Sequence, residues 1–212
     1  MTPSGGAAKT ELSRGGSLTV LPANEVSWED LQAVLGSTSE GRRCQCQWFQ
    51  TPAAEWRSVS ADERAARLRD QTRCDDPDAP ATTGLVAFLD GEPVGWCSVA
   101  PRTFFRHLQT MRVPWAGRDD DREDEGVWSV VCFVTRTGYR RRGVSAALAR
   151  AAVGFARSQG ARAIEGYPMI VDPGRELTWG ELYVGAYSVF ADAGFEEVSR
   201  PTKRRAVMRV DL

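Results

Sequence analysis

The sequence predicts an α/β (α+β) domain, because segments with the period of a strand alternate along the chain with segments of helical period. The central observation is a strand, a turn and a helix that follow one another within residues 127–160. A second is the pair Asp90-Gly91 between two apolar runs, the strongest short signal for a β-hairpin. The composition, 42% hydrophobic and 26% charged over 212 residues, suffices for one domain with a sizeable core.

The central unit begins with an apolar, β-branched run over residues 127–134, long enough for one buried strand and too short for a membrane span. A polar turn containing Gly138 follows. From Gly143 the apolar residues recur with helical spacing, and Gly160 then ends the helix as a C′ glycine. The apolar stripe of this helix consists of Val144, Ala147, Leu148, Ala151 and Phe155.

The turn of this unit, residues 140–145, reads RRRGVS. A helix N-terminus leaves backbone N–H groups unpaired and carries a partial positive charge, so the turn can hold a phosphate or pyrophosphate. The motif is neither GxxxxGK(S/T) nor GxGxxG with an acidic residue about twenty positions further on. It therefore differs from the two best-known phosphate loops.

The unit resembles the acetyl-CoA signature of the GNAT acyltransferases, Q/R-x-x-G-x-G/A after a central strand. Arg140, Gly143 and Ser145 occupy its defined positions, with Ser145 in place of Gly or Ala. The resemblance implies that strand backbone pairs with pantetheine, that one strand N–H polarises the thioester oxygen, and that turn amides hold the pyrophosphate. The cofactor-binding residues that it implies are Phe133, Val134, Thr135, Arg140, Arg141, Arg142, Gly143, Val144, Ser145 and Ala146.

Local patterns predict the remaining elements. Strands are expected over residues 18–21, 84–89, 92–100, 162–167, 195–198 and 206–210. Helices are expected after a cap at Ser27, over residues 62–72 behind a capping box of Ser60 and Glu63, over a short segment 104–109, and over residues 180–193.

This order resembles the GNAT fold, a mixed, mostly antiparallel sheet of about seven strands flanked by about four helices. The resemblance implies that the fourth and fifth strands splay apart to admit the pantetheine arm. The resemblance covers residues 18–212, which are expected to form a single domain. Within the family, the sequence is similar to an uncharacterised bacterial branch that has CQC near the start. Residues 1–17, rich in Gly, Ser, Thr and Ala without periodicity, are expected to form a disordered tail.

The proton donor departs from the family pattern. Many members place a tyrosine four residues before the helix-ending glycine, whereas this chain has Phe190 four residues before Gly194, and a phenyl ring cannot protonate a thiolate. Tyr187 and Tyr183 lie three and seven residues before Phe190, on one face of the expected helix, so they are the candidate catalytic acids. The alternatives are that both tyrosines only pack, or that the acidic thiol leaves without help.

Residues 41–52 crowd Cys44, Cys46, Trp48 and Phe49 into six positions. A structural zinc site needs four ligands, and the other cysteines and the single histidine form no second pair at ligand spacing, so no metal is expected. One alternative is an extended segment that buries alternate residues. The other is a pocket wall, which makes Trp48 and Phe49 candidate substrate-binding residues.

Residues 117–126 carry six acidic side chains and two arginines. Such a run is typical of solvated surface. The alternative is a lip of the substrate pocket, which would attract a cationic amine.

Net charge, hydropathy and cysteine content limit the classes of partner and the cellular compartment that can be expected for this protein. A net charge of −1 lacks the basic footprint of a nucleic-acid-binding protein. Without an apolar run of membrane length or a secretory signal, and with an odd number of cysteines, the chain is expected in the cytoplasm with reduced thiols. The expected partners are acetyl-CoA, as co-substrate, and an amine, while a homodimer is left open.

The resemblance implies an acetyl-CoA-dependent N-acetyltransferase in which a primary amine attacks the thioester directly. The acceptor is left open between a small-molecule amine or drug and a lysine or N-terminal amine of a protein. The alternative is a CoA-binding module without catalysis, which the absent tyrosine favours. One histidine in a weakly patterned segment supports no competing Ser-His-Asp or Cys-His site.

Overall fold

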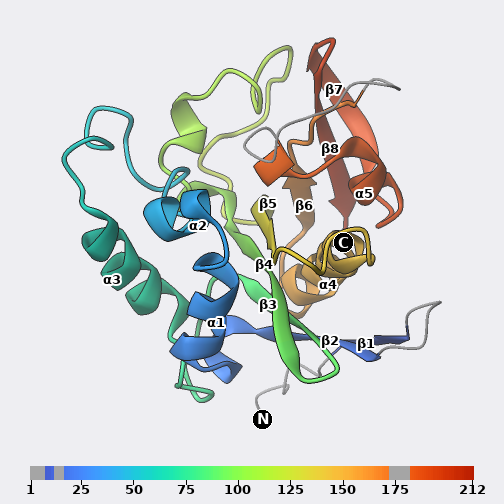
Figure 1. The fold of residues 1–212 in the computed structure, drawn as a ribbon. Helices are drawn as coiled ribbons and strands as arrows, with labels where there is room; N and C mark the ends of the chain where they lie inside the picture. The colour runs from blue at the N-terminus through green and yellow to red at the C-terminus, as the bar shows by residue number, and fades with distance from the viewer. Residues whose placement is uncertain (1–7, 12–16, 172–181) are drawn as a thin grey trace.

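A computed structural model describes residues 8–11, 17–171 and 182–212 (Figure 1). Its strands are β1 (Ala8–Glu11), β2 (Ser17–Pro22), β3 (Leu85–Leu89), β4 (Glu92–Pro101), β5 (Val127–Thr135), β6 (Ala163–Gly166), β7 (Glu196–Thr202) and β8 (Arg205–Asp211). Its α-helices are α1 (Trp28–Leu35), α2 (Ser39–Cys44), α3 (Ala61–Thr72), α4 (Val144–Ser158) and α5 (Tyr187–Ala191). Its 3₁₀ turns are η1 (Ala23–Glu25), η2 (Arg102–Phe104), η3 (Leu108–Thr110) and η4 (Leu182–Val184).

The strands form one sheet in the order β1-β2-β3-β4-β5-β6-β8-β7. Every neighbouring pair is antiparallel except β5 and β6, so the prediction of a mixed, mostly antiparallel sheet is confirmed. The helix that connects the parallel pair is α4, as a crossover between parallel strands requires.

One strand lies where a tail without structure was expected. Ala8–Glu11 forms β1, which pairs with β2 from Ala8 opposite Val20 to Glu11 opposite Ser17. The prediction for residues 1–17 is therefore wrong for this strand, because a pairing edge on β2 orders a segment whose composition alone gives no strand signal. The rest of the expected tail, up to residue 16, lies outside the described residues.

Helices cover both faces of the sheet. Figure 1 shows α1, α2 and α3 on one side and α4 and α5 on the other, and each side has its own apolar core. Helix α4 packs closely because its buried face is mostly alanine and because β4 carries a glycine beneath it: a Cβ on Gly95 would lie 2.4 Å from Val144 Cγ1. None of the helices in the described part of the chain is long and apolar enough to cross a membrane.

The local signals for turns and caps are confirmed. Asp90 and Gly91 connect β3 to β4 with φ of 52° and 87°, as the two central residues of a type I′ hairpin require. Ser27 Oγ accepts the Asp30 N–H at the start of α1, and Ser60 Oγ accepts the Glu63 N–H at the start of α3.

The prediction of one continuous helix over residues 180–193 is wrong. In the described residues it is divided into η4 and α5 at Gly185, whose φ is +83°. The Gly185 carbonyl accepts the Met169 N–H at 2.9 Å, and the Tyr187 N–H donates to the Met169 carbonyl at 2.9 Å. Because residues 185–187 pair sideways with residue 169, their backbone groups are not available to a continuous helix.

A buried glutamate ties the second half of the sheet together. Glu165 of β6 has no exposed surface, and its carboxylate contacts three guanidinium groups. Arg102 and Arg209 lie 3.2 Å and 3.1 Å from it, and Arg118 also pairs with it. The Tyr167 hydroxyl donates to the same carboxylate at 3.1 Å. A buried carboxylate requires such partners, because an unpaired charge away from water is strongly destabilising.

The acidic segment 117–126 belongs largely to this framework. Asp120 pairs with Arg118 at 2.8 Å, and the Asp121 carbonyl accepts from Arg102 at 2.6 Å. Asp124 pairs with Arg162 at 2.7 Å, which lowers the pKa of Asp124. Two of its six acidic side chains are therefore held in ion pairs, while the other four, Asp119, Asp121, Glu123 and Glu125, are exposed as expected of a solvated run.

We predict that Glu165→Gln lowers the free energy of unfolding by about 3–5 kcal/mol, because it leaves three guanidinium groups around a neutral amide. Urea denaturation measures this value. The matched control is Glu197→Gln, which breaks a partly exposed pair with Arg200 and should cost less than about 1 kcal/mol. Equal losses in the two variants would contradict the structural role of Glu165.

Candidate active site

Strand β5 is paired fully on one side and only in part on the other. On one side β4 pairs with it as far as Thr135, whereas β6 accompanies it only from Val127 to Val130. No described strand pairs with residues 131–135 on the β6 side, although η4 lies close to β5. A strand edge without a strand partner is a place where an extended ligand can pair. The two strands diverge as expected for the central pair.

A β-bulge marks the point where the strands part. Val130 pairs with Val99 and Cys132 pairs with Ser98, so Val131 is an extra residue without a partner on β4. A bulge redirects the backbone locally and is frequent beside binding sites. Here it lies at the start of the open edge.

The turn from β5 to α4 has the geometry of an anion site. Gly143 precedes α4 with φ of +78°, and the first bond within the helix runs from the Ala147 N–H to the Gly143 carbonyl at 3.0 Å. The amides of residues 144–146 come before that bond, at the positive end of a helix of 15 residues. Ser145 Oγ lies 3.4 Å from Thr135 Oγ1, which joins the helix start to the strand end. The side chains of residues 140–142 are exposed.

A cavity of about 250 Å³ lies between residues of α2, its following loop and β5. Four rings line it: Trp48, Phe49, Trp56 and Tyr183. The other lining residues are three cysteines and three further residues: Cys44, Cys46, Cys132, Glu40, Gly41 and Val134. Two of them, Cys132 and Val134, belong to the open half of β5, so the cavity and the open edge share one strand.

Comparison with known proteins identifies the family. The model of the acetyltransferase (GNAT) family matches residues 46–167, more than half of the chain. The chain belongs to the GNAT family. The matched segment contains Trp48, β5 and the turn before α4, and a search of the curated proteins found no match.

Solved structures share the GNAT fold with this chain. The GNAT domain of S. lividans PAT is 17% identical, with 97% of each chain covered and a TM-score of 0.50. A GNAT-family acetyltransferase from Bacillus anthracis is 10% identical, with 97% of this chain and 98% of that chain covered and a TM-score of 0.52. At these identities the likeness shows the fold alone.

The structure brings together four of the residues predicted for the site of this GNAT protein: Trp48, Phe49, Val134 and Tyr183 all line the cavity. Tyr187 is not among the lining residues. It lies on α5, half-buried against the core on the α4 side. The break at Gly185 separates the two tyrosines that the helical pattern placed on one face.

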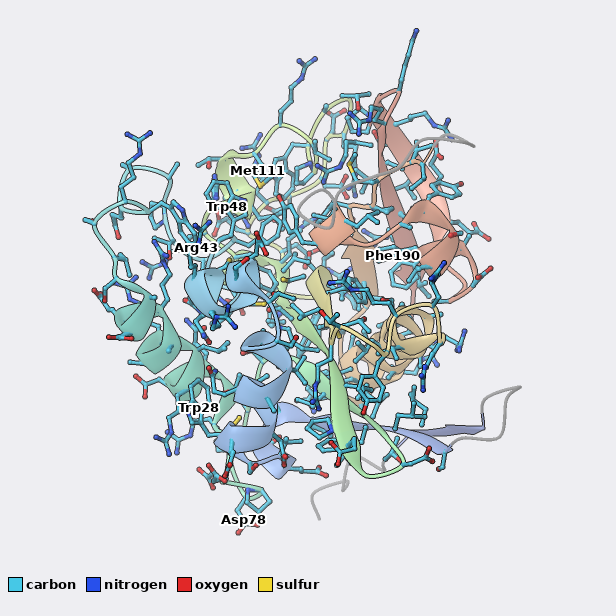
Figure 2. All side chains as sticks on the ribbon, in the orientation of Figure 1. Trp28, Arg43, Trp48, Asp78, Met111 and Phe190 are labelled. Carbon is cyan, nitrogen blue, oxygen red and sulfur yellow. The ribbon has the colours of Figure 1, made fainter. Side chains whose placement is uncertain are left out.

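Phe190 occupies the core on the α5 side. It belongs to α5, and Figure 2 shows it on the α5 side of the molecule, whereas Trp48 lies on the α2 side. Its ring fills space between two glycines, since a Cβ on Gly166 would lie 2.0 Å from it and a Cβ on Gly185 would lie 2.7 Å from it. It also packs against Phe133 and Phe195 at 5.7 and 5.0 Å between ring centroids. Phe190 is therefore a packing residue.

The segment with the cysteines is a helix and a turn, not an extended strand. Helix α2 ends at Cys44, and Gln45 and Cys46 adopt left-handed backbone with φ of 47° and 51°. This turn reverses the chain so that Cys44, Cys46 and Trp48 face one cavity. The interpretation as alternate residues of a strand is wrong, because Thr38 Oγ1 accepts the Gly41 N–H and so caps a helix that the pattern analysis had missed.

Two of the cysteines that line the cavity, Cys46 and Cys132, are hydrogen-bonded to each other. The Cys46 thiol donates to Cys132 Sγ at 3.0 Å and accepts from Trp96 Nε1 at 2.9 Å. The hydrogen bond to Cys132 and burial together raise the pKa of the Cys46 thiol well above its usual value. Among the described residues, no group of three metal-binding side chains comes together.

Sequence reasoning missed Glu40, Trp56 and Arg64. The Arg64 guanidinium lies 3.8 Å from the ring centroid of Trp56 and donates to the carbonyls of Arg43 and Trp56. Trp56 in turn meets Trp48 edge to face at 5.1 Å. A tryptophan within a polar loop was the available signal for Trp56, whereas nothing local links Arg64 to it.

We predict that Cys44 reacts slowly with iodoacetamide in the folded protein, because burial raises the pKa of its thiol from 9.0 to about 11 and the thiolate is the reactive form. Near neutral pH the rate should be about a hundredfold below that of a free cysteine, and it should rise until the pH reaches about 11. Peptide mass spectrometry measures the modified fraction, with urea-unfolded protein as the reference. Equal rates in folded and unfolded protein would contradict the buried position.

Proposed function

We propose that this GNAT protein is an acetyl-CoA-dependent N-acetyltransferase that transfers an acetyl group to a primary amine by direct attack on the thioester. The observation that carries the proposal is the arrangement around β5: an open edge at residues 131–135, an anion-binding turn at its end and an apolar cavity beside it. In this proposal pantetheine would bind along the open edge, the pyrophosphate at the turn and the acceptor in the cavity, all beside one strand.

The cofactor residues fit an acyl-CoA. Backbone groups of Phe133, Val134 and Thr135 would pair with pantetheine along the open edge, and amides of residues 141–146 would hold the pyrophosphate. The exposed arginines 140–142 add positive charge that attracts the phosphates. A backbone N–H near the bulge at Val131 would stabilise the developing oxyanion.

The chemistry requires a free amine and a proton for the departing thiolate. An alkyl ammonium has a pKa near 10.4, so roughly one amine in a thousand is free base near pH 7.4. Positioning of the amine against the thioester then supplies much of the rate. We propose Tyr183 as the acid, because it lines the cavity and because burial raises the pKa of its hydroxyl, which stays protonated at neutral pH. Tyr187 is the second candidate.

We predict that Gly143→Glu raises the Kd for CoA at least about a hundredfold, because it places a carboxylate at the pyrophosphate site. Calorimetric titration measures the Kd. Gly143→Gln is the matched control: it has the same size and the same cost for a φ of +78°, but it adds no charge. Wild-type affinity in a natively folded Gly143→Glu protein would contradict the cofactor site.

We predict that Tyr183→Phe lowers kcat at least about tenfold with little change in the KM for acetyl-CoA, the pattern of a group that acts mainly in the transition state. Because burial raises the pKa of Tyr183 above its usual 10.0, wild-type kcat should fall only as the pH rises beyond that value. Steady-state thiol release with an amine found by screening measures both effects. Tyr187→Phe is the matched control, and an impaired Tyr187→Phe beside an unimpaired Tyr183→Phe would assign the acid to Tyr187.

A non-catalytic CoA-binding module is the second candidate, favoured by the buried Phe190 at the position where many members of the family carry a tyrosine. Screening an amine library for acetylated products by mass spectrometry separates the two. CoA binding without product from any amine would favour the second candidate.

A further inference from the structure

The cavity beside β5 has a composition that selects among amines. Its rings, Trp48, Phe49, Trp56 and Tyr183, present mostly apolar surface. The described residues that line it include no lysine or arginine, whereas Arg43 and Arg64 line an adjoining hollow that shares Glu40, Cys44 and Trp56 with it. Its volume of about 250 Å³ exceeds the ~150 Å³ of an engineered apolar cavity that holds one benzene molecule. One ring system with a short alkyl arm therefore fits.

The rings of Trp48 and Trp56 form the aromatic wall of the cavity, and contacts outside the cavity hold both in place. Trp48 packs between Trp56 and His107, with centroid distances of 5.1 Å and 4.7 Å. The His107 N–H donates to the Phe49 carbonyl at 2.9 Å, and His107 Nδ1 lies 2.9 Å from the Trp48 carbonyl. Arg64 fixes Trp56 from the other end. A wall with these supports is preformed, so little conformational entropy is lost when a flat ligand binds.

One carboxylate lies in this lining. Glu40 receives a hydrogen bond from Ser39 Oγ at 2.8 Å, which lowers the pKa of Glu40 and keeps it ionised at neutral pH. Arg43 and Arg42 lower its pKa further from outside the lining. Glu40 is the charge that the described lining itself contributes, and beside aromatic faces it attracts one ammonium group and repels carboxylates. A polyamine would have to place its second ammonium against apolar rings, where an unpaired charge is unfavourable.

Building on the acetyl transfer proposed above, we propose that the acceptor is a primary monoamine carried on an aromatic body. The rings of Trp48 and Trp56 bind the body, and Glu40 draws the ammonium group to the mouth of the cavity. Amino acids and polyamines are poor acceptors at this site.

Four amines test the acceptor class: phenethylamine, cyclohexylethylamine, phenylalanine and putrescine. Acetylated products are quantified by mass spectrometry, and the Kd of each amine is measured by calorimetry on the CoA-bound protein. We expect kcat/KM for phenethylamine to exceed that for phenylalanine and putrescine at least about tenfold, and the flat ring to be preferred to cyclohexyl.

Variants test the two selecting groups. Trp48→Ala should raise the KM for phenethylamine at least about tenfold. Glu40→Gln, at an exposed position that should not perturb folding, should lower kcat/KM for phenethylamine and raise it for phenylalanine, so that the ratio between the two falls at least about fivefold. The matched control is Glu29→Gln on exposed α1 surface, which should leave the ratio unchanged.

The outcomes separate this inference from the proposed function. Acetylation of phenylalanine or putrescine in preference to phenethylamine, or no binding of phenethylamine, would overturn the acceptor class. An unchanged ratio in Glu40→Gln would overturn the role of that carboxylate. Saturable binding of phenethylamine without transfer to any amine would support the amine site and contradict the acetyltransferase activity.

Discussion

The buried carboxylate of Glu165 is the interaction on which the site depends. It joins Arg102 after β4, Arg118 of the following segment and Arg209 of β8 to the middle of β6. Tyr167, which donates to the same carboxylate, lies 2.9 Å from Ser129 Oγ of β5. These contacts keep β6 beside β5 up to Gly166, and beyond that point the strands part. Since an ion inside the protein is tolerated only when it is fully paired, the point of divergence is fixed by charge as well as by strand register.

Features that neighbouring residues determine could be predicted from the sequence. The hairpin at Asp90-Gly91 requires positive φ at two adjacent positions, and α4 requires only its own stripe and its flanking glycines. The network around Glu165 gives no such signal, because its arginines lie 63, 47 and 44 residues away along the chain. A glutamate in a short strand reads locally as an exposed residue.

The candidate site likewise has one part that neighbouring residues determine and one part that depends on tertiary contacts. The turn at residues 140–145 is one contiguous motif and could be found directly. The cavity beside β5 is instead assembled from α2 and its following loop, the second half of β5 and η4. Helical periodicity placed Tyr183 and Tyr187 on one face. The backbone of Gly185 instead pairs with Met169, and this tertiary bond overrides the local preference for a helix.

The two ionisable oxygen groups of the cavity have a consequence for how the enzyme would respond to its surroundings. The pKa of Glu40 is lowered and that of Tyr183 is raised, so neither group changes charge when the pH varies around neutrality. No histidine is among the described residues that line the cavity. With the proposed acetyl transfer, the amine itself then brings a pH dependence that these two oxygen groups do not. Acidity would control the reaction through the supply of deprotonated acceptor, and a less basic amine would extend turnover to lower pH without any change in the protein.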